Sequence, residues 1–292
     1  MDRLRLRWLA FALLLGVGVP ATGWAHQPVM DMAPRWDGGW GLQVRNEFRS
    51  SNKLLSGDSK RANPQGRKRR VNTTWLEGVY TFVRAVRVTA KIPWVEQSRV
   101  SVVSGSAVKQ TGSGLGDAIL GLQLKHYINR EASTANFGLT PSLRFPTGST
   151  SDAYPVGDGS WDVGVSASFS HETTFLYQFY DLSYWHNSKG KRGIDRGDEV
   201  GLDVNVGVHP YHDNRHNLGF FLMADLSARY EGHGEDTAGT TGGKRVSLGP
   251  IFVGYWNNLM LRFDVKFPVY QRVWGSQVAH GTEFNAGLGV VF

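Results

Sequence analysis

The 292-residue sequence contains no cysteine and no continuous run of 18 or more apolar residues. The absence of cysteine excludes a disulfide scaffold, a cysteine-ligated zinc or iron–sulfur site and a thiol nucleophile. The lack of a long apolar run excludes a polytopic helical membrane protein. The 36 glycines follow no Gly-X-Y period, which excludes collagen, and the 10 Trp and 10 Tyr exclude simple disorder.

The first 25 residues have the composition of a secretory signal. Three arginines precede an apolar stretch over residues 8–19, and small residues flank a cleavage point at Ala25. About a dozen apolar residues are too few to span a bilayer, so this segment predicts export. We expect cleavage after Ala25 and a periplasmic leader over residues 26–37. Loss of the three arginines and one aspartate of the signal lowers the formal net charge from +7 to +5.

From Gly38 to the C-terminus, apolar and polar residues alternate with a period of two. The stretch 118–125 is typical, because Leu120, Leu122 and Leu124 alternate with polar or small residues. This is the period of a β-strand rather than of a helix. Counted along the chain, the pattern predicts about 12 strands.

Alternation alone fits two fold classes, a soluble β-sandwich or barrel and a membrane β-barrel with the faces reversed. Three features favour the membrane barrel. The strands are about 10 to 13 residues long, enough to cross a bilayer when tilted. Five short turns near residues 84, 129, 172, 212 and 257 alternate with six longer loops near 60, 105, 152, 192, 238 and 276. A barrel of 12 strands with both termini on the periplasmic side has five short periplasmic turns and six longer loops on the other side, which agrees with this count.

The third feature is the position of the tryptophans. Tryptophans stand towards the ends of several predicted strands, as in the interfacial girdles of membrane proteins, namely Trp40, Trp94, Trp161, Trp185 and Trp256. The chain also ends on Phe292, a feature typical of outer-membrane barrels that the barrel-assembly machinery recognises. The sequence therefore predicts an all-β, transmembrane, antiparallel up-and-down barrel over residues 38–292, located in the outer membrane.

The polar face of the predicted strands carries charges of both signs. These side chains are expected to line the lumen: Arg45, Glu47, Lys91, Lys125, Arg144, Asp162, Asp203, Asp225, Arg229, Arg262, Asp264, Lys266 and Glu283. Buried charges of opposite sign should pair. The pairs could simply fill the interior of a structural surface barrel, or they could form a polar conduit that selects a small-molecule substrate.

Residues 50–70 hold seven Lys and Arg against one Asp. A nucleic-acid partner is not expected, since the protein is predicted to be exported and the run lacks interleaved aromatics. One interpretation is a solvated, mobile loop. The other is a loop that faces outer-membrane lipid and the phosphates of lipopolysaccharide.

Two glycine-rich motifs are typical of transitions from loop to strand. Gly114-Leu115-Gly116-Asp117 precedes a strand, and Phe145-Pro146-Thr147-Gly148 is followed by Gly157-Asp158-Gly159-Ser160-Trp161-Asp162. Glycine supplies turn dihedrals and Asp caps them. The first motif is not a phosphate-binding loop, because no helix or Gly-Lys-Ser/Thr follows it.

These motifs, in this order over roughly residues 70–292, resemble the outer-membrane family named for the MetA-pathway of phenol degradation. The resemblance implies a barrel and transport of aromatic or other hydrophobic small molecules. It implies no particular substrate-binding residues. Residues 50–70 and the His26 start lie outside the resemblance.

Two further chemistries remain as alternatives. His186-Asn187-Ser188-Lys189-Gly190 resembles the His-x-Ser-x-Gly of outer-membrane phospholipase A, and residues two apart share a strand face, so His186 could activate Ser188 for acyl hydrolysis. Lys189 departs from that pattern. His26 at the mature N-terminus, with Met30 and Met32, could chelate copper. We expect neither catalysis nor a metal, and no cofactor.

Overall fold

The computed structural model describes residue 34 and residues 36–103, 105–152, 154–191, 196–234 and 242–292. The predicted signal, and His26, Met30 and Met32 with it, lie outside the described residues. No membrane-spanning helix is found in the part of the chain that the structure describes.

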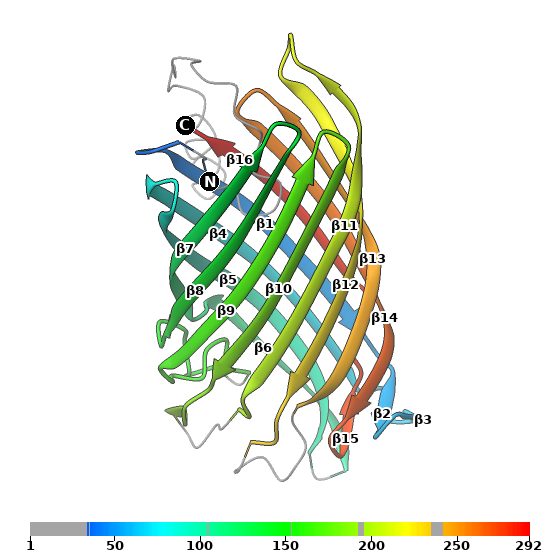
Figure 1. The fold of residues 1–292 in the computed structure, drawn as a ribbon. Coiled ribbons are helices and arrows are strands. Elements are labelled where there is room, and N and C mark those ends of the chain that lie inside the picture. The colour runs from blue at the N-terminus through cyan, green and yellow to red at the C-terminus, as the bar shows by residue number, and fades with distance from the viewer. Residues whose placement is uncertain (1–33, 35, 104, 153, 192–195, 235–241) are drawn as a thin grey trace, which may run out of the picture.

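The described chain forms a closed antiparallel β-barrel of 12 strands, which confirms the predicted fold class (Figure 1). Its strands are β1 (Trp40–Ser51), β4 (Lys68–Val83), β5 (Val86–Val103), β6 (Ser106–Leu115), β7 (Ala118–Arg130), β8 (Ser133–Phe145), β9 (Asp162–Thr173), β10 (Leu176–His186), β11 (Glu199–Asp213), β12 (Leu218–Glu231), β13 (Gly243–Trp256), β14 (Leu259–Val273) and β16 (Glu283–Val291). The segments β6 and β7 together make one strand of the twelve, since β5 pairs with both.

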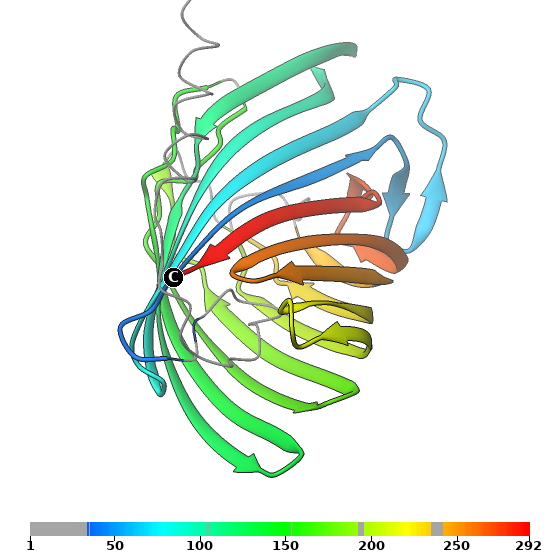
Figure 2. The same cartoon turned by 90° about the horizontal axis from the view of Figure 1, so that it is seen from above.

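Closure of the barrel joins the two ends of the chain. β1 pairs with β16 from Gly41 opposite Val291 to Arg49 opposite Glu283. Trp40 and Phe292 exchange two backbone hydrogen bonds, of 2.6 and 2.8 Å. Figure 2 shows β16 beside β1 at the end of the barrel that carries the C-terminus. Because every strand has two partners, the barrel has no free edge through most of its height.

The two ends of the barrel differ. Short turns at 84–85, 131–132, 174–175, 214–217 and 257–258 lie at the end where β1 begins and β16 finishes, here named the turn end. The longer connections lie at the opposite end, the loop end. At the turn end Asn217 and Asn257 adopt left-handed φ angles of 45° and 51°, which Asn tolerates better than most residues. The predicted alternation of turns and loops is therefore present.

One predicted loop differs. The region near residue 105 is a tight turn that pairs Val103 with Ser106 in a long β5–β6 hairpin. The strand interruption lies instead at Gly116 and Asp117, between β6 and β7. Residues 106–115 contain few apolar residues and show no regular alternation, so the sequence could not show that they form a strand.

Apolar side chains cover the outer face of every barrel strand. Leu261 and Phe263 on β14, for example, are 40% and 46% exposed. Among the predicted girdle residues, Trp40, Trp94, Trp161 and Trp256 are exposed, as expected. Trp185 is different, because it packs inside against Arg144, whose guanidinium lies 4.4 Å from the ring centroid. The prediction for Trp185 was wrong.

The basic segment is not an irregular loop. Residues of β2 (Leu54–Ser56) pair with β3 (Ser59–Arg61) and also with β15 (Ser276–Val278) in a small sheet at the loop end. The three residues of β3 are exposed. This pairing fixes the basic hairpin beside the connection that follows β14.

Trypsin added to intact cells is expected to cut at Lys60 or Arg61, because this exposed hairpin tip should face outward. Cleavage is read from the fragment sizes on a gel. A variant with Lys60→Gln and Arg61→Gln, which changes only exposed positions, should lose that cut. Protection of the parent protein in intact cells, with cleavage only after the outer membrane is opened, would invert the topology.

Candidate functional site

The inner face of the barrel towards the loop end carries a network of ion pairs. Arg45 on β1 donates to Glu77 of the adjacent β4, from Nη2 to Oε1 at 2.9 Å and from Nε at 3.2 Å. Its Nη1 donates to the Asn285 amide oxygen on the other side, at 3.1 Å. One arginine therefore bridges β4, β1 and β16 across the inner wall.

A second group of pairs spans β11, β12 and β14. Arg229 donates to both Asp203 oxygens, at 2.8 and 2.7 Å. Lys266 lies 3.2 Å from Asp225, and the Ser227 hydroxyl lies 2.7 Å from Asp203 and 3.0 Å from Asp225, so that its one proton is shared between the two carboxylates. Bidentate and shared contacts of this kind are stronger than single surface pairs.

The structure brings most of the predicted inward residues into such contacts. Arg144 pairs with Asp162 at 3.0 Å and Arg262 with Asp264 at 2.9 Å. Lys91 lies directly opposite Glu77 on the neighbouring strand, and Lys125 opposite Gly138. Glu47 and Glu283 both contact an arginine that the sequence analysis did not include, Arg49, at 3.1 and 3.8 Å.

Sequence reasoning also missed Glu77, Arg87 and Arg245. Glu77 is isolated among Leu, Gly and Val in a segment whose alternation is poor. Only its register with Arg45 on β1 reveals its role.

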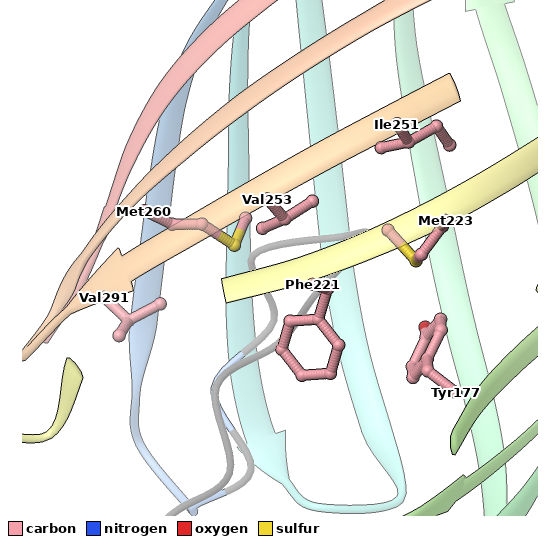
Figure 3. Packing of buried hydrophobic residues seen from close by; sticks show 7 residues of the cluster. All are labelled: Tyr177, Phe221, Met223, Ile251, Val253, Met260 and Val291. Carbon is pink, nitrogen blue, oxygen red and sulfur yellow. The ribbon is translucent and has the colours of Figure 1, made fainter. Parts of the chain in front are cut away.

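On one side of the barrel, along β10, β12, β13, β14 and β16, the inner face towards the turn end is apolar, which the alternation did not predict. Seven buried side chains form one cluster there, namely Tyr177, Phe221, Met223, Ile251, Val253, Met260 and Val291 (Figure 3). Phe179 and Tyr255 pack against it. The interior thus has a charged zone at the loop end and, on one side of the turn end, an apolar, aromatic zone, whereas Arg87 and Glu172 are buried on the other side.

Histidine 209 borders the apolar zone. Its ring stacks on Phe221, with centroids 4.0 Å apart and planes 9° apart, and the Tyr255 hydroxyl lies 2.9 Å from its Nε2. His216 instead lies 2.6 Å from Asp213 in the neighbouring turn. Among the described residues no three His, Cys, Asp or Glu side chains are placed to hold a metal ion.

The motifs that carry the family resemblance meet at the break between β6 and β7. One Asp117 oxygen accepts from the Gly148 amide at 2.9 Å, and the other accepts from the Asp158 amide at 3.3 Å. Thr147 accepts from the Ala118 amide at 2.9 Å. We name this group the motif junction, since it fastens the connection 146–161 to the wall where β6 lacks a second partner strand.

The motif junction allows no side chain at two positions. A Cβ added to Gly157 would lie 2.7 Å from the Gly148 Cα, and one added to Gly148 would lie 2.7 Å from the Gly157 Cα. Both contacts are with backbone, which cannot move aside as a flexible side chain can. Two glycines are therefore required where the two arms of the connection cross.

A hydrogen-bonded chain leads from the motif junction into the interior. The Ser160 hydroxyl lies 2.6 Å from Asp158 and 2.8 Å from Asp162, so that its one proton is shared between them, and Asp162 binds Arg144. Burial opposes ionisation of Asp158, but Arg196, at 3.3 Å, and the Ser160 hydrogen bonds hold its pKa below the ordinary value. The carboxylate of this connection therefore stays charged at neutral pH.

The two residues of the hydrolase alternative do not contact each other. His186 Nδ1 lies 3.0 Å from Asp198 on an exposed face, and Ser188 donates its hydroxyl proton to the Trp161 carbonyl. The Ser188 amide is bound to Asp162. In this arrangement each side chain is already engaged elsewhere.

Comparison with known proteins identifies the family. The sequence profile described as "Putative MetA-pathway of phenol degradation" matches residues 62–286, more than half of the chain. The chain belongs to this family. The resemblance of its motifs is thereby confirmed. No curated protein sequence matches the chain.

Solved structures share the fold. The COG4313 outer membrane channel from Pseudomonas putida F1 has a TM-score of 0.69 at 15% identity, with 94% of this chain and 100% of that chain covered. The β domain of the Bordetella autotransporter Brka has a TM-score of 0.50 at 11% identity, with 88% and 100% covered. At these identities the likeness shows an outer-membrane β-barrel fold, and the turn end corresponds to the periplasmic side in such barrels.

Proposed function

We propose that this barrel conducts small solutes across the outer membrane, with a preference for molecules that carry an aromatic or other apolar part. The observation that carries the proposal is the division of the interior into two zones. A solute entering from the loop end meets the ion pairs around Arg45 and Arg229, and then the aromatic wall of Phe221 and Tyr255. If the inward side chains only filled the interior, no such order of a charged zone followed by an apolar zone would be expected.

The family and the outer-membrane channel fold support a channel role. The charged residues predicted to line the lumen are proposed to line the solute path. The phosphates of lipopolysaccharide are proposed to contact the basic hairpin. Export by cleavage after Ala25 and recognition of Phe292 by the assembly machinery stay predictions.

Proteoliposomes that contain the purified barrel should take up phenol and benzoate faster than a neutral sugar of similar size. Phe221→Leu should slow aromatic uptake about three- to tenfold, since aromatic contacts contribute about 0.5–1.5 kcal/mol. The matched control is Phe252→Leu, on the lipid face of the adjacent strand, which should leave uptake unchanged.

Equal uptake of the sugar and the aromatics would remove the proposed preference. No uptake of any solute would favour a structural surface barrel. Release of fatty acid from phospholipid, lost in Ser188→Ala, would favour the hydrolase alternative.

A further inference from the structure

A partly open cavity of about 200 Å³ lies on the inner wall at the loop end, within the charged zone. Five adjacent strands contribute to it, since β12, β13, β14, β16 and β1 are neighbours in the sheet. Its charged lining residues are Glu47, Arg49, Arg229, Arg245, Lys266 and Glu283. Four cations therefore face two carboxylates.

Three of the four cations are neutralised. Arg229 binds both oxygens of Asp203, just behind the lining, and Lys266 lies 3.2 Å from Asp225. Arg49 lies 3.1 Å from Glu47 and 3.8 Å from Glu283.

Arg245 is different, because its strand neighbours offer it no anion. Arg229 lies directly opposite it on β12, and Gln271 lies opposite on β14. The Gln271 amide is already used, since it accepts from the His280 backbone N–H at 2.7 Å and donates to the His280 carbonyl at 2.9 Å. Among the described residues, no carboxylate lies within ion-pair distance of Arg245. The cavity thus holds one guanidinium that has no ion pair among the described residues, next to a second arginine, with Glu283 and Glu231 acting on it only from a greater distance.

The two hydrogen bonds between the Gln271 amide and the His280 backbone also fix His280 in the cavity wall. His280 Nδ1 lies 3.0 Å from the Gly281 carbonyl and so must carry the proton that it donates. Nε2 then presents a lone pair. This atom is buried and makes no hydrogen bond to a described residue, the nearest carboxylate oxygen being that of Glu283 at 3.8 Å. Burial and the surrounding arginines Arg245, Arg49 and Arg69 lower the pKa of His280 to about 2, so the ring is neutral.

The cavity therefore combines a cation that lacks an ion pair among the described residues with a buried ring nitrogen that lacks a hydrogen-bond partner there, which a ligand reaches only by displacing the atoms that cover it. We propose that it is a binding site for a small monocarboxylate that also carries a hydroxyl group, with the carboxylate on Arg245 and the hydroxyl donating to His280 Nε2. The hydroxyl of Ser247, also in the lining, can donate to the second carboxylate oxygen. A volume of about 200 Å³ suits one substituted benzene ring. This inference rests on the proposed solute conduction and names the class of solute.

Titration calorimetry of the whole barrel in detergent micelles tests the site with three probes: 4-hydroxybenzoate, benzoate and phenol. We expect 4-hydroxybenzoate to bind most tightly and phenol least. Arg245→Gln should weaken both carboxylates roughly tenfold, the loss expected for a charge-assisted hydrogen bond, and leave phenol unchanged. His280→Gln should reduce the advantage of 4-hydroxybenzoate over benzoate.

The matched control is Arg272→Gln, which removes the same charge from an exposed position on the neighbouring strand β14. It should bind all three probes as the parent does. Folding of each variant is checked by its heat-modifiable migration on gels. Carboxylate affinity that is the same in Arg245→Gln and in the parent would overturn the site, and so would phenol binding as tightly as 4-hydroxybenzoate.

The proposed binding site and the proposed solute conduction can be refuted independently of each other. If the parent binds 4-hydroxybenzoate through Arg245 but no solute crosses the proteoliposome membrane, conduction is wrong and the site stands. If solutes cross and Arg245→Gln changes neither binding nor uptake, the site is wrong and conduction stands.

Discussion

Replacing Asp162 by alanine is expected to lower the free energy of unfolding of the barrel by about 3–5 kcal/mol, the cost of leaving a buried ionic partner alone. Asp162 is fully buried, and its two oxygens accept from Arg144 at 3.0 Å, from Ser160 at 2.8 Å and from the Ser188 amide at 3.0 Å. Alanine would remove all three bonds and leave the Arg144 guanidinium without its carboxylate. Urea unfolding in micelles measures the change.

An exposed pair provides the control. His216 and Asp213 lie 2.6 Å apart, but the His216 side chain is 71% exposed. His216→Ala, which breaks the pair and leaves the backbone hydrogen bonds of the turn to Asp213 in place, should therefore cost less than about 1 kcal/mol. Equal losses in the two variants would mean that the Arg144–Asp162 pair is not protected from solvent as the structure has it.

Replacing Gly157 by alanine is expected to release the connection 146–161 from the barrel wall. The new methyl group would meet the Gly148 Cα at 2.7 Å, and overpacking against backbone costs about 1–3 kcal/mol. That cost shifts a local opening equilibrium roughly tenfold or more. Chymotrypsin should then cut after Tyr154 about tenfold faster than in the parent.

Gly78→Ala is the control for this experiment, because its nearest neighbour is the flexible end of Leu42, at 3.5 Å. It should be cut at the parent's rate. Unchanged cleavage in Gly157→Ala would mean that the two arms of the connection can separate at no cost, and the motif junction would then not hold the connection.

The outer face of the barrel could be predicted from the sequence because side chains that contact lipid must be apolar. Leu261 and Phe263 face outward for the same reason that Arg262 faces inward, and a period of two is enough to say so. The partners of the inward charges could not be predicted. Arg45 meets Glu77 because β1 and β4 pair in one particular register, and a shift by one residue would turn every side chain to the other face.

The apolar zone was missed for a different reason. Phe221 and Met223 alternate with Phe220 and Leu222, so both faces of β12 are apolar there and no period is visible. The motif junction was missed because Asp117 and Asp158 are 41 positions apart and meet through a connection rather than through a strand pairing. The signal in the sequence that could have pointed to this contact was that both motifs combine glycine with aspartate.

The pairing of Gly41 with Val291 has a consequence for how the molecule forms. Because β16 pairs with both β1 and β14, the barrel cannot close until the nine residues of β16 are in place. Contacts across nearly the whole chain length make for slow folding. Throughout that delay the lipid-facing rows are exposed to water, where they promote aggregation. We therefore expect the unfolded chain to need shielding from water before it inserts. The yield of this protein should depend on the time that the barrel takes to close more than on the stability of the closed barrel.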